Sequence, residues 1–174
     1  LIYNLGGNGF KIEGSSNTIY SGNTSNNIIA GDIAGSGRYA LVTETQGYPS
    51  SLSVYLTDNT VQYKYDFSEY YVTDISLNSD GTRAAVSGIT AKDGGIVSAV
   101  YIFDFSDPEP IAILTYNEVL MEKVEYMDNG TVAAIGDTTT SMINGTTGEK
   151  VDYNYQSRQM TDYAIDKNRV ALAL

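Results

Sequence analysis

The sequence predicts an all-β fold built from consecutive four-stranded antiparallel units. One hairpin pattern recurs along the chain at intervals of roughly 40–50 residues, which is typical of a repeat architecture. Strand-forming residues are abundant, with 15 Tyr among 174 residues. No segment has the apolar periodicity that would sustain a helix of ordinary length. We therefore expect strands throughout the chain.

The recurring hairpin is centred on a glycine in a tight turn. Gly37, Gly81 and Gly130 are 44 and 49 residues apart, and Asn168 takes the same place 38 residues later. Asn is the residue next best suited to the positive φ of such turns. Small apolar residues follow each turn, as in Ala84–Val86. Because these runs are unbroken, they predict strands that are buried on both faces.

Two more strands complete each repeat. The third strand closes in Asp or Asn, and the fourth alternates polar and apolar residues, which favours an outermost strand facing solvent. The third strands are predicted at Leu52–Asp58, Ser98–Asp104 and Ser141–Asn144. The fourth strands are predicted at Val61–Tyr65, Ile111–Thr115 and Lys150–Tyr155.

Partial repeats are predicted at the two ends. The first supplies three strands at Leu1–Leu5, Gly9–Glu13 and Thr18–Gly22, and the last supplies two at Met160–Ile165 and Arg169–Leu174. With three complete repeats this gives 17 strands. We predict one domain, residues 1–174, forming a β-propeller segment of about four blades. Its units are 1–27 (partial), 28–71, 72–120, 121–159 and 160–174 (partial).

The ends of the chain fall inside strand-like runs, so we expect a piece of a longer protein. Open terminal blades expose edges that invite pairing. We therefore expect two chains to close a ring or to share a blade as a homo-oligomer. The alternative is a closed four-bladed monomer in which Arg169–Leu174 pairs with Gly9–Glu13.

These features resemble WD40-like and quinoprotein-like propellers. The resemblance lies in the Ser79–Gly81 turn, the small buried second strand, and Ile102–Asp104 at the place of the WD dipeptide. Tyr71–Asn78 and Ala134–Thr138 resemble an uncharacterised family of propeller proteins from Gram-positive bacteria. That resemblance implies a propeller tethered by an N-terminal membrane helix, in an extracytoplasmic location, and implies no activity or site residues. The chain has no His, so the Gly-His dipeptide of true WD40 repeats is absent.

Composition excludes several classes of chemistry. The formal net charge of −11 argues against nucleic-acid binding, which needs a basic face. With no His, catalytic triads and imidazole metal sites are excluded, and with no Cys, thiolate chemistry is excluded too. We predict no cofactor, no metal and no catalytic residue, and no membrane insertion by this segment.

Three carboxylates recur near the start of the predicted innermost strands. Asp32, Asp74 and Asp162 each precede an apolar residue, and Lys123 takes this place in the third repeat. In a propeller these positions lie near the mouth of the central channel, where carboxylates could hold a cation or cationic ligand. The alternative is that each Asp caps a nearby backbone N–H.

The loops from fourth to first strands and from second to third strands share one end of a propeller. Tyr and Arg, which are enriched at interaction hot spots, occur on these loops. The predicted partner surface consists of Tyr48, Pro49, Tyr70, Tyr71, Tyr155 and Arg158. The alternative is that these aromatics pack between blades.

We predict a non-enzymatic binding or scaffold propeller whose partner is a protein, peptide or glycan. The alternative is a ligand-binding sensor or carboxylate-only hydrolase that uses the central channel. For the hydrolase, candidate acids are Glu122, Glu125, Asp104 and Asp107. A third hypothesis is a purely structural spacer.

Overall fold

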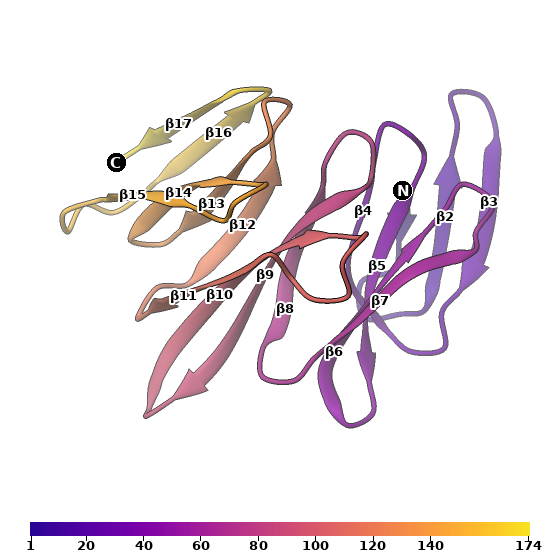
Figure 1. The fold of residues 1–174 in the computed structure, drawn as a ribbon, viewed down its shortest axis with the longest axis horizontal. Coiled ribbons are helices and arrows are strands. Elements are labelled where there is room, and N and C mark those ends of the chain that lie inside the picture. Colours follow the sequence, from indigo (N-terminus) through magenta and orange to yellow (C-terminus); the bar gives the residue numbers. More distant parts are fainter.

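The computed structural model describes residues 1–174 and shows an all-β protein of 17 strands (Figure 1). Five separate antiparallel sheets follow one another in chain order, with three, four, four, four and two strands. The predicted number of strands and their distribution over the repeats are confirmed. Among the elements there is no helix with the length and apolar character of a membrane span.

We number the sheets 1 to 5 along the chain. Sheet 1 contains β1 (Ile2–Tyr3), β2 (Gly9–Glu13) and β3 (Thr18–Asn23). Sheet 2 contains β4 (Ile28–Ile33), β5 (Tyr39–Thr45), β6 (Tyr48–Tyr55) and β7 (Val61–Phe67). Sheet 3 contains β8 (Tyr71–Leu77), β9 (Arg83–Lys92), β10 (Gly95–Asp104) and β11 (Ala112–Asn117). Sheet 4 contains β12 (Met121–Tyr126), β13 (Thr131–Gly136), β14 (Thr139–Asn144) and β15 (Lys150–Asn154). Sheet 5 contains β16 (Asp162–Asp166) and β17 (Arg169–Ala173).

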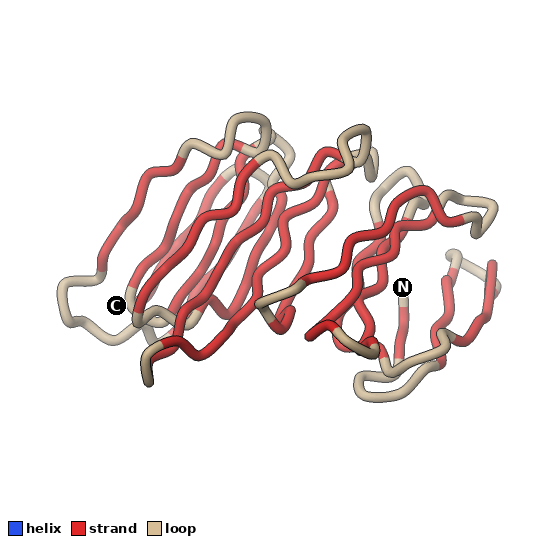
Figure 2. Tube along the Cα trace, turned by 60° about the horizontal axis from the view of Figure 1, so that its bottom comes forward, coloured by secondary structure: helices blue, strands red, loops and turns tan.

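The sheets stack face to face in an open series, which Figure 2 shows from a second side. The first strand β8 packs against both β4 and β12, so sheets 2, 3 and 4 meet along their first strands. The largest core, 19 buried residues, fills the space between sheets 2 and 3. Smaller cores lie between sheets 1 and 2, 3 and 4, and 4 and 5.

The closed four-bladed monomer is wrong. β17 pairs only with β16, and sheets 1 and 5 lie at opposite ends of the series (Figure 1). The physical reason is that β2 is paired on both edges, with β1 and β3, and so offers no free edge to another strand. Closure of a ring by two chains stays a prediction.

Aromatic rings dominate the core between sheets 2 and 3. Phe103 is fully buried, and its ring centroid lies 5.1 Å from that of Tyr65 and 6.0 Å from that of Tyr101. Tyr63 and Phe67 complete the group with edge contacts to Phe103 at 6.0 and 6.2 Å. Edge and offset contacts of this kind add to the stabilisation that burial of the rings provides.

One alanine recurs on the face that each sheet turns toward the next. Ala40, Ala85 and Ala133 are fully buried, each in the core shared with the following sheet. A small residue here lets the larger side chains of the next sheet approach the backbone closely. Ala171 takes this place in sheet 5 and is exposed. The face of sheet 5 that carries Ala171 therefore has the small residue typical of a sheet interface, but no sheet covers it.

Buried serines tie consecutive sheets together. Ser50 Oγ accepts a hydrogen bond from the Val72 N–H (3.1 Å) and donates to the Tyr70 carbonyl (3.3 Å). Ser98 Oγ does the same one sheet later, with the Met121 N–H (3.0 Å) and the Val119 carbonyl (2.7 Å). Each serine thereby satisfies two backbone groups where the first strand of the next sheet begins.

Stability is expected to fall between pH 10 and 12, because burial raises the pKa of Tyr63 and of Tyr116 to about 12. A raised tyrosine pKa contributes stability that is complete below the unfolded value near 10 and is lost as pH rises to the folded value. At pH 11 the loss is about 1.4 kcal/mol for each tyrosine. Urea unfolding at pH 9 and pH 11 measures it. Coincident unfolding curves at the two values would contradict the expectation, and Tyr63→Phe should reduce the difference.

Candidate functional site

Loops of the two kinds that the sequence associated with binding lie together at one end of the strands. The segment Asn23–Asn26 joins sheet 1 to sheet 2, and the Gln46–Gly47 turn joins β5 to β6. Asn27 ties the two together, because its side chain donates to Glu44 Oε2 (2.9 Å) and its carbonyl accepts from the Glu44 N–H (2.9 Å). The two kinds of loop therefore form one continuous surface.

The six residues of the predicted partner surface divide into two groups. Tyr48 and Tyr71 are 46% and 43% exposed, and Arg158 is exposed as well. Pro49 is half-buried. These four remain on the surface of the protein.

Tyr70 and Tyr155 are not available to a partner, which corrects that part of the prediction. Tyr155 is fully buried, and its hydroxyl donates to the Gly136 carbonyl (3.0 Å) and bonds with the Thr140 hydroxyl (2.6 Å). Arg158 covers it, donating from Nε to the Tyr155 carbonyl (3.0 Å). Tyr70 is buried in the core between sheets 2 and 3, where its ring lies 5.9 Å from that of Tyr101. Both tyrosines pack between sheets, as the alternative hypothesis had it.

Two of the three recurring carboxylates, Asp32 and Asp74, bind backbone N–H groups of the following sheet. Asp32 Oδ1 accepts from its neighbour Ile33 (2.8 Å), and Oδ2 accepts from Leu77 N–H of sheet 3 (2.7 Å). Asp74 Oδ2 accepts from Val124 N–H of sheet 4 (2.9 Å). Each carboxylate thus links two sheets by a bond between residues 45 or 50 positions apart. A local cap would have bonded only within its own turn.

The predicted ring of carboxylates does not form. Asp74, Lys123 and Asp162 occupy equivalent places, each opposite the residue two positions beyond the recurring alanine. Asp32 is out of phase, because it lies opposite Ala40 itself. No group of three or more acidic side chains comes close enough to share a metal ion. Asp32 and Asp74 instead accept hydrogen bonds from backbone N–H groups, and Asp74 also binds Lys123.

Asp74 and Lys123 form an ion pair between sheets 3 and 4. Lys123 Nζ lies 3.2 Å from Asp74 Oδ2 and 3.5 Å from Glu125 Oε2. Burial raises the pKa of Asp74, against the opposing effects of the Val124 N–H and the Lys123 ammonium. The carboxylates of Asp74 and Glu125 outweigh the effect of burial on Lys123 and raise the pKa of its ammonium. The lysine therefore stays charged and bound at neutral pH.

Asp162 makes only one of the two kinds of hydrogen bond that Asp32 makes. Its Oδ1 accepts from the Tyr163 N–H (2.8 Å), and no donor of the protein bonds Oδ2. With the exposed Ala171 on the same sheet, this carboxylate lines a shallow hollow of about 210 Å³ that also includes Leu172. The outer face of sheet 5 thus repeats the interface chemistry of the inner sheets.

The other candidate acids do not form a catalytic pair. Asp104 Oδ2 binds Arg83 Nε (3.0 Å), and its Oδ1 accepts from Ser106 N–H (3.0 Å). Asp107 accepts from the Glu109 N–H (3.3 Å). Glu125 binds Lys123, and Glu122 is exposed on β12. These carboxylates serve turns and ion pairs.

A polar groove of about 310 Å³ lies at the loop end, between the Asn23–Asn26 segment and sheet 2. Its floor is the face of sheet 2 that is turned toward sheet 1. On that face apolar Tyr39 and Leu41 meet the core of sheet 1. Further along β5, and on β6 and β7, the groove is lined by side chains with hydroxyl or ammonium groups instead. They are Thr43, Thr45, Ser51, Ser53, Tyr55 and Lys64.

The polar groups on the groove floor make no hydrogen bond or ion pair within the protein. Nearby groups are satisfied, since the Thr24 hydroxyl donates to the Asn26 carbonyl (2.6 Å). The buried hydroxyls of Ser50 and Ser98 are satisfied as well. Free hydroxyls that both donate and accept are the means by which a pocket orients a polar ligand. This groove is therefore the candidate binding site.

Sequence reasoning missed the groove floor, although the signal was present. Ser51 and Ser53 alternate with the buried Leu52 and Val54, which marks a polar face. Because the sequence does not show how far two neighbouring sheets splay apart, that face was indistinguishable from one open to bulk solvent. The cleft exists because sheet 1 covers Tyr39 and Leu41 at the start of β5 and leaves free the later part of β5 and the neighbouring residues of β6 and β7.

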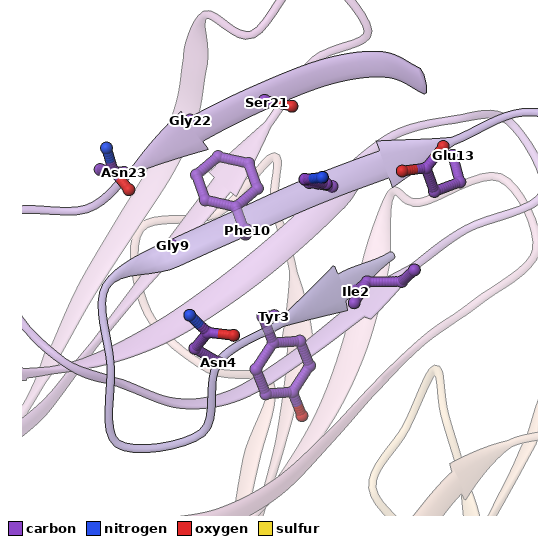
Figure 3. Close-up of a pocket in the computed structure, with 10 residues that line it drawn as sticks. Ile2, Tyr3, Asn4, Gly9, Phe10, Glu13, Ser21, Gly22 and Asn23 are labelled. Atoms are coloured by element: carbon purple, nitrogen blue, oxygen red, sulfur yellow. The ribbon is translucent and has the colours of Figure 1, made fainter. Parts of the chain in front are cut away.

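The largest hollow, about 440 Å³, lies on the outer face of sheet 1 (Figure 3). Ile2, Lys11 and Ser21 form one row across this face, and Glu13 stands at its end. No sheet of the chain packs on this side, so the hollow is the concave face of a single sheet. The polar groove is bounded by sheet 2 on one side and by the segment Asn23–Asn26 on the other, which is why we favour it as the site.

No curated protein matches the chain. A family described as a family of unknown function, DUF5711, matches residues 1–174. The match spans the whole chain, and the protein therefore belongs to the DUF5711 family.

Proposed function

We propose that the five sheets are consecutive blades of a β-propeller segment and that the protein is a non-enzymatic binding scaffold. Ordered stacking of four-stranded antiparallel meanders, with first strands packed together, supports the propeller. Ligand binding at the loop end of a rigid scaffold is the common use of such folds. The ligand classes are those expected from the sequence: protein, peptide or glycan.

The free hydrogen-bonding capacity of the groove carries this proposal. Six side chains from three adjacent strands present polar groups to one space of about 310 Å³, and none is bonded within the protein. That volume lies within the range of about 300–1,000 Å³ that is typical of small-ligand sites. No carboxylate lines the groove, so it lacks the acid pair that hydrolysis would need. Binding without chemistry is the function that this lining supports.

The cellular location that we propose rests on the sequence resemblance. We propose an extracytoplasmic position, with the full-length protein anchored to the membrane. Digestion of intact cells by an added protease tests it: the protein should be cleaved without lysis, and protection until the cells are lysed would contradict the proposal.

Blocking the groove should abolish ligand capture. Ser53→Leu places an apolar side chain on its floor, and Thr115→Leu, on the exposed face of β11, is the matched control. Arrays of glycans and peptides are probed with the wild type and both variants. We expect ligands whose affinity falls at least about tenfold, a change of about 1.4 kcal/mol, in Ser53→Leu alone. Equal binding by all three proteins, or no bound ligand, would contradict the proposal.

A further inference from the structure

We infer that the groove selects a saccharide that carries a carboxylate, with Lys64 as the residue that recognises the acid. The inference rests on the proposed function and specifies its ligand class. It is based on three features of the groove: the density of free hydroxyls, an aromatic ring held in a fixed position, and an unpaired cation in a lining without acids.

The hydroxyl groups of the groove indicate a ligand that itself carries several hydroxyl groups. Thr43 lies directly opposite Ser51 across the β5–β6 pair, and Ser53 lies opposite Lys64 across the β6–β7 pair. In these two neighbouring rows, three hydroxyls and one ammonium line the groove, and the exposed Asp66, opposite Ser51, lies outside its lining. Each hydroxyl can donate and accept, as the hydroxyls of a sugar do, so either partner can adjust to the other. Residues of the segment Asn23–Asn26 form the opposite wall.

Tyr55 supplies a rigid apolar surface beside these hydroxyls. Its ring is stacked on that of Tyr39, with centroids 4.7 Å apart and planes 6° apart. Tyr39 is itself buried, and its hydroxyl donates to Asn59 Oδ1 (3.1 Å). One face of Tyr55 is thereby covered, and its position is fixed before any ligand arrives. An aromatic ring next to polar groups matches a sugar ring, which has an apolar C–H face and a polar edge.

Lys64 gives the groove its charge preference. The chain has 21 acidic and 10 basic residues, yet no Asp or Glu lines this groove. Four other hollows, of about 210 to 440 Å³, each include at least one carboxylate. Lys123 and Lys150 bind carboxylates, whereas Lys64 has none within ion-pair distance, including Asp66 on its own strand. An ammonium left free among hydroxyls is suited to a carboxylate on a polyhydroxylated ligand.

Paired disaccharides that differ only in their carboxylates test this inference. Isothermal titration compares cellobiouronic acid with cellobiose, and galacturonate and mannuronate disaccharides with their neutral counterparts. We expect at least one acidic member to bind about tenfold more tightly than its neutral partner, the lower end for a hydrogen bond to a charged group. Lys64→Gln should remove this preference. Lys92→Gln, the same change at the exposed end of β9, should leave it intact.

The outcomes separate this inference from the proposed function. Equal affinities within each pair, or a preference that survives Lys64→Gln, would overturn the role of Lys64 and leave groove binding standing. Absence of binding by every disaccharide would overturn the saccharide class. The proposed function then depends on the array experiment with Ser53→Leu, which includes peptides and neutral glycans.

Discussion

Phe103→Ala is expected to lower the free energy of unfolding by about 3–5 kcal/mol, the range for truncating a buried Phe. Phe103 is fully buried at the centre of the aromatic group between sheets 2 and 3. Three of the four rings around it come from β7 of sheet 2 and the fourth from β10, its own strand, so the truncation leaves a space between two sheets. Removal of the ring also forfeits the stacked contact with Tyr101 and the edge contact with Tyr65.

Urea unfolding at neutral pH, followed by circular dichroism, measures this loss. Tyr153→Ala is the control, because Tyr153 is 51% exposed on the outermost strand β15. Its truncation should change stability by no more than about 0.5 kcal/mol, as is usual for surface substitutions. Similar losses in the two variants would show that the core between sheets 2 and 3 does not determine stability.

Asp74→Ala should destabilise the protein by about 3 kcal/mol. The variant leaves the Val124 N–H without an acceptor and removes the principal partner of the half-buried Lys123. Loss of one member of a buried ion pair destabilises by about 3–5 kcal/mol. Partial exposure of both side chains places this pair at the lower end of that range. The same unfolding measurement applies.

Asp162→Ala is the matched control for Asp74. Asp162 stands at the equivalent place of sheet 5, where its side chain bonds only the next N–H along the chain. Its replacement should therefore change the unfolding free energy by less than about 1 kcal/mol. A loss as large as that of Asp74→Ala would mean that the bond between sheets is not what makes Asp74 important.

The fold was accessible from the sequence because its signals are local. Turn glycines such as Gly81, with φ of 69°, and the apolar run Ala84–Val86 depend only on their own hairpin. The strand bounds were less accessible. β9 extends to Lys92 and β10 begins at Gly95, so this hairpin is longer than the apolar run indicated. Its outer part is held by strand pairing rather than by burial.

The site was only partly accessible, because it depends on contacts between sheets. Tyr155 follows an exposed strand and precedes a polar loop, which predicts a surface residue. Its burial comes from the packing of Thr140 and Met160 around its hydroxyl. Asp32 and Asp74 looked equivalent in sequence, and only the strand register shows that they are two positions out of phase.

Each sheet is linked only to its immediate neighbours, and this determines where local unfolding should begin. Asp32, Ser50, Asp74 and Ser98 all bond the sheet that follows, and sheets further apart share no core. Cooperativity in such a series passes from neighbour to neighbour, as in solenoid repeats. Sheets 1 and 5 each have one neighbour and should exchange their amide hydrogens first. The groove, which lies between sheets 1 and 2, is thus placed where the least stable unit meets the rest of the scaffold, and a ligand bound there would slow that opening.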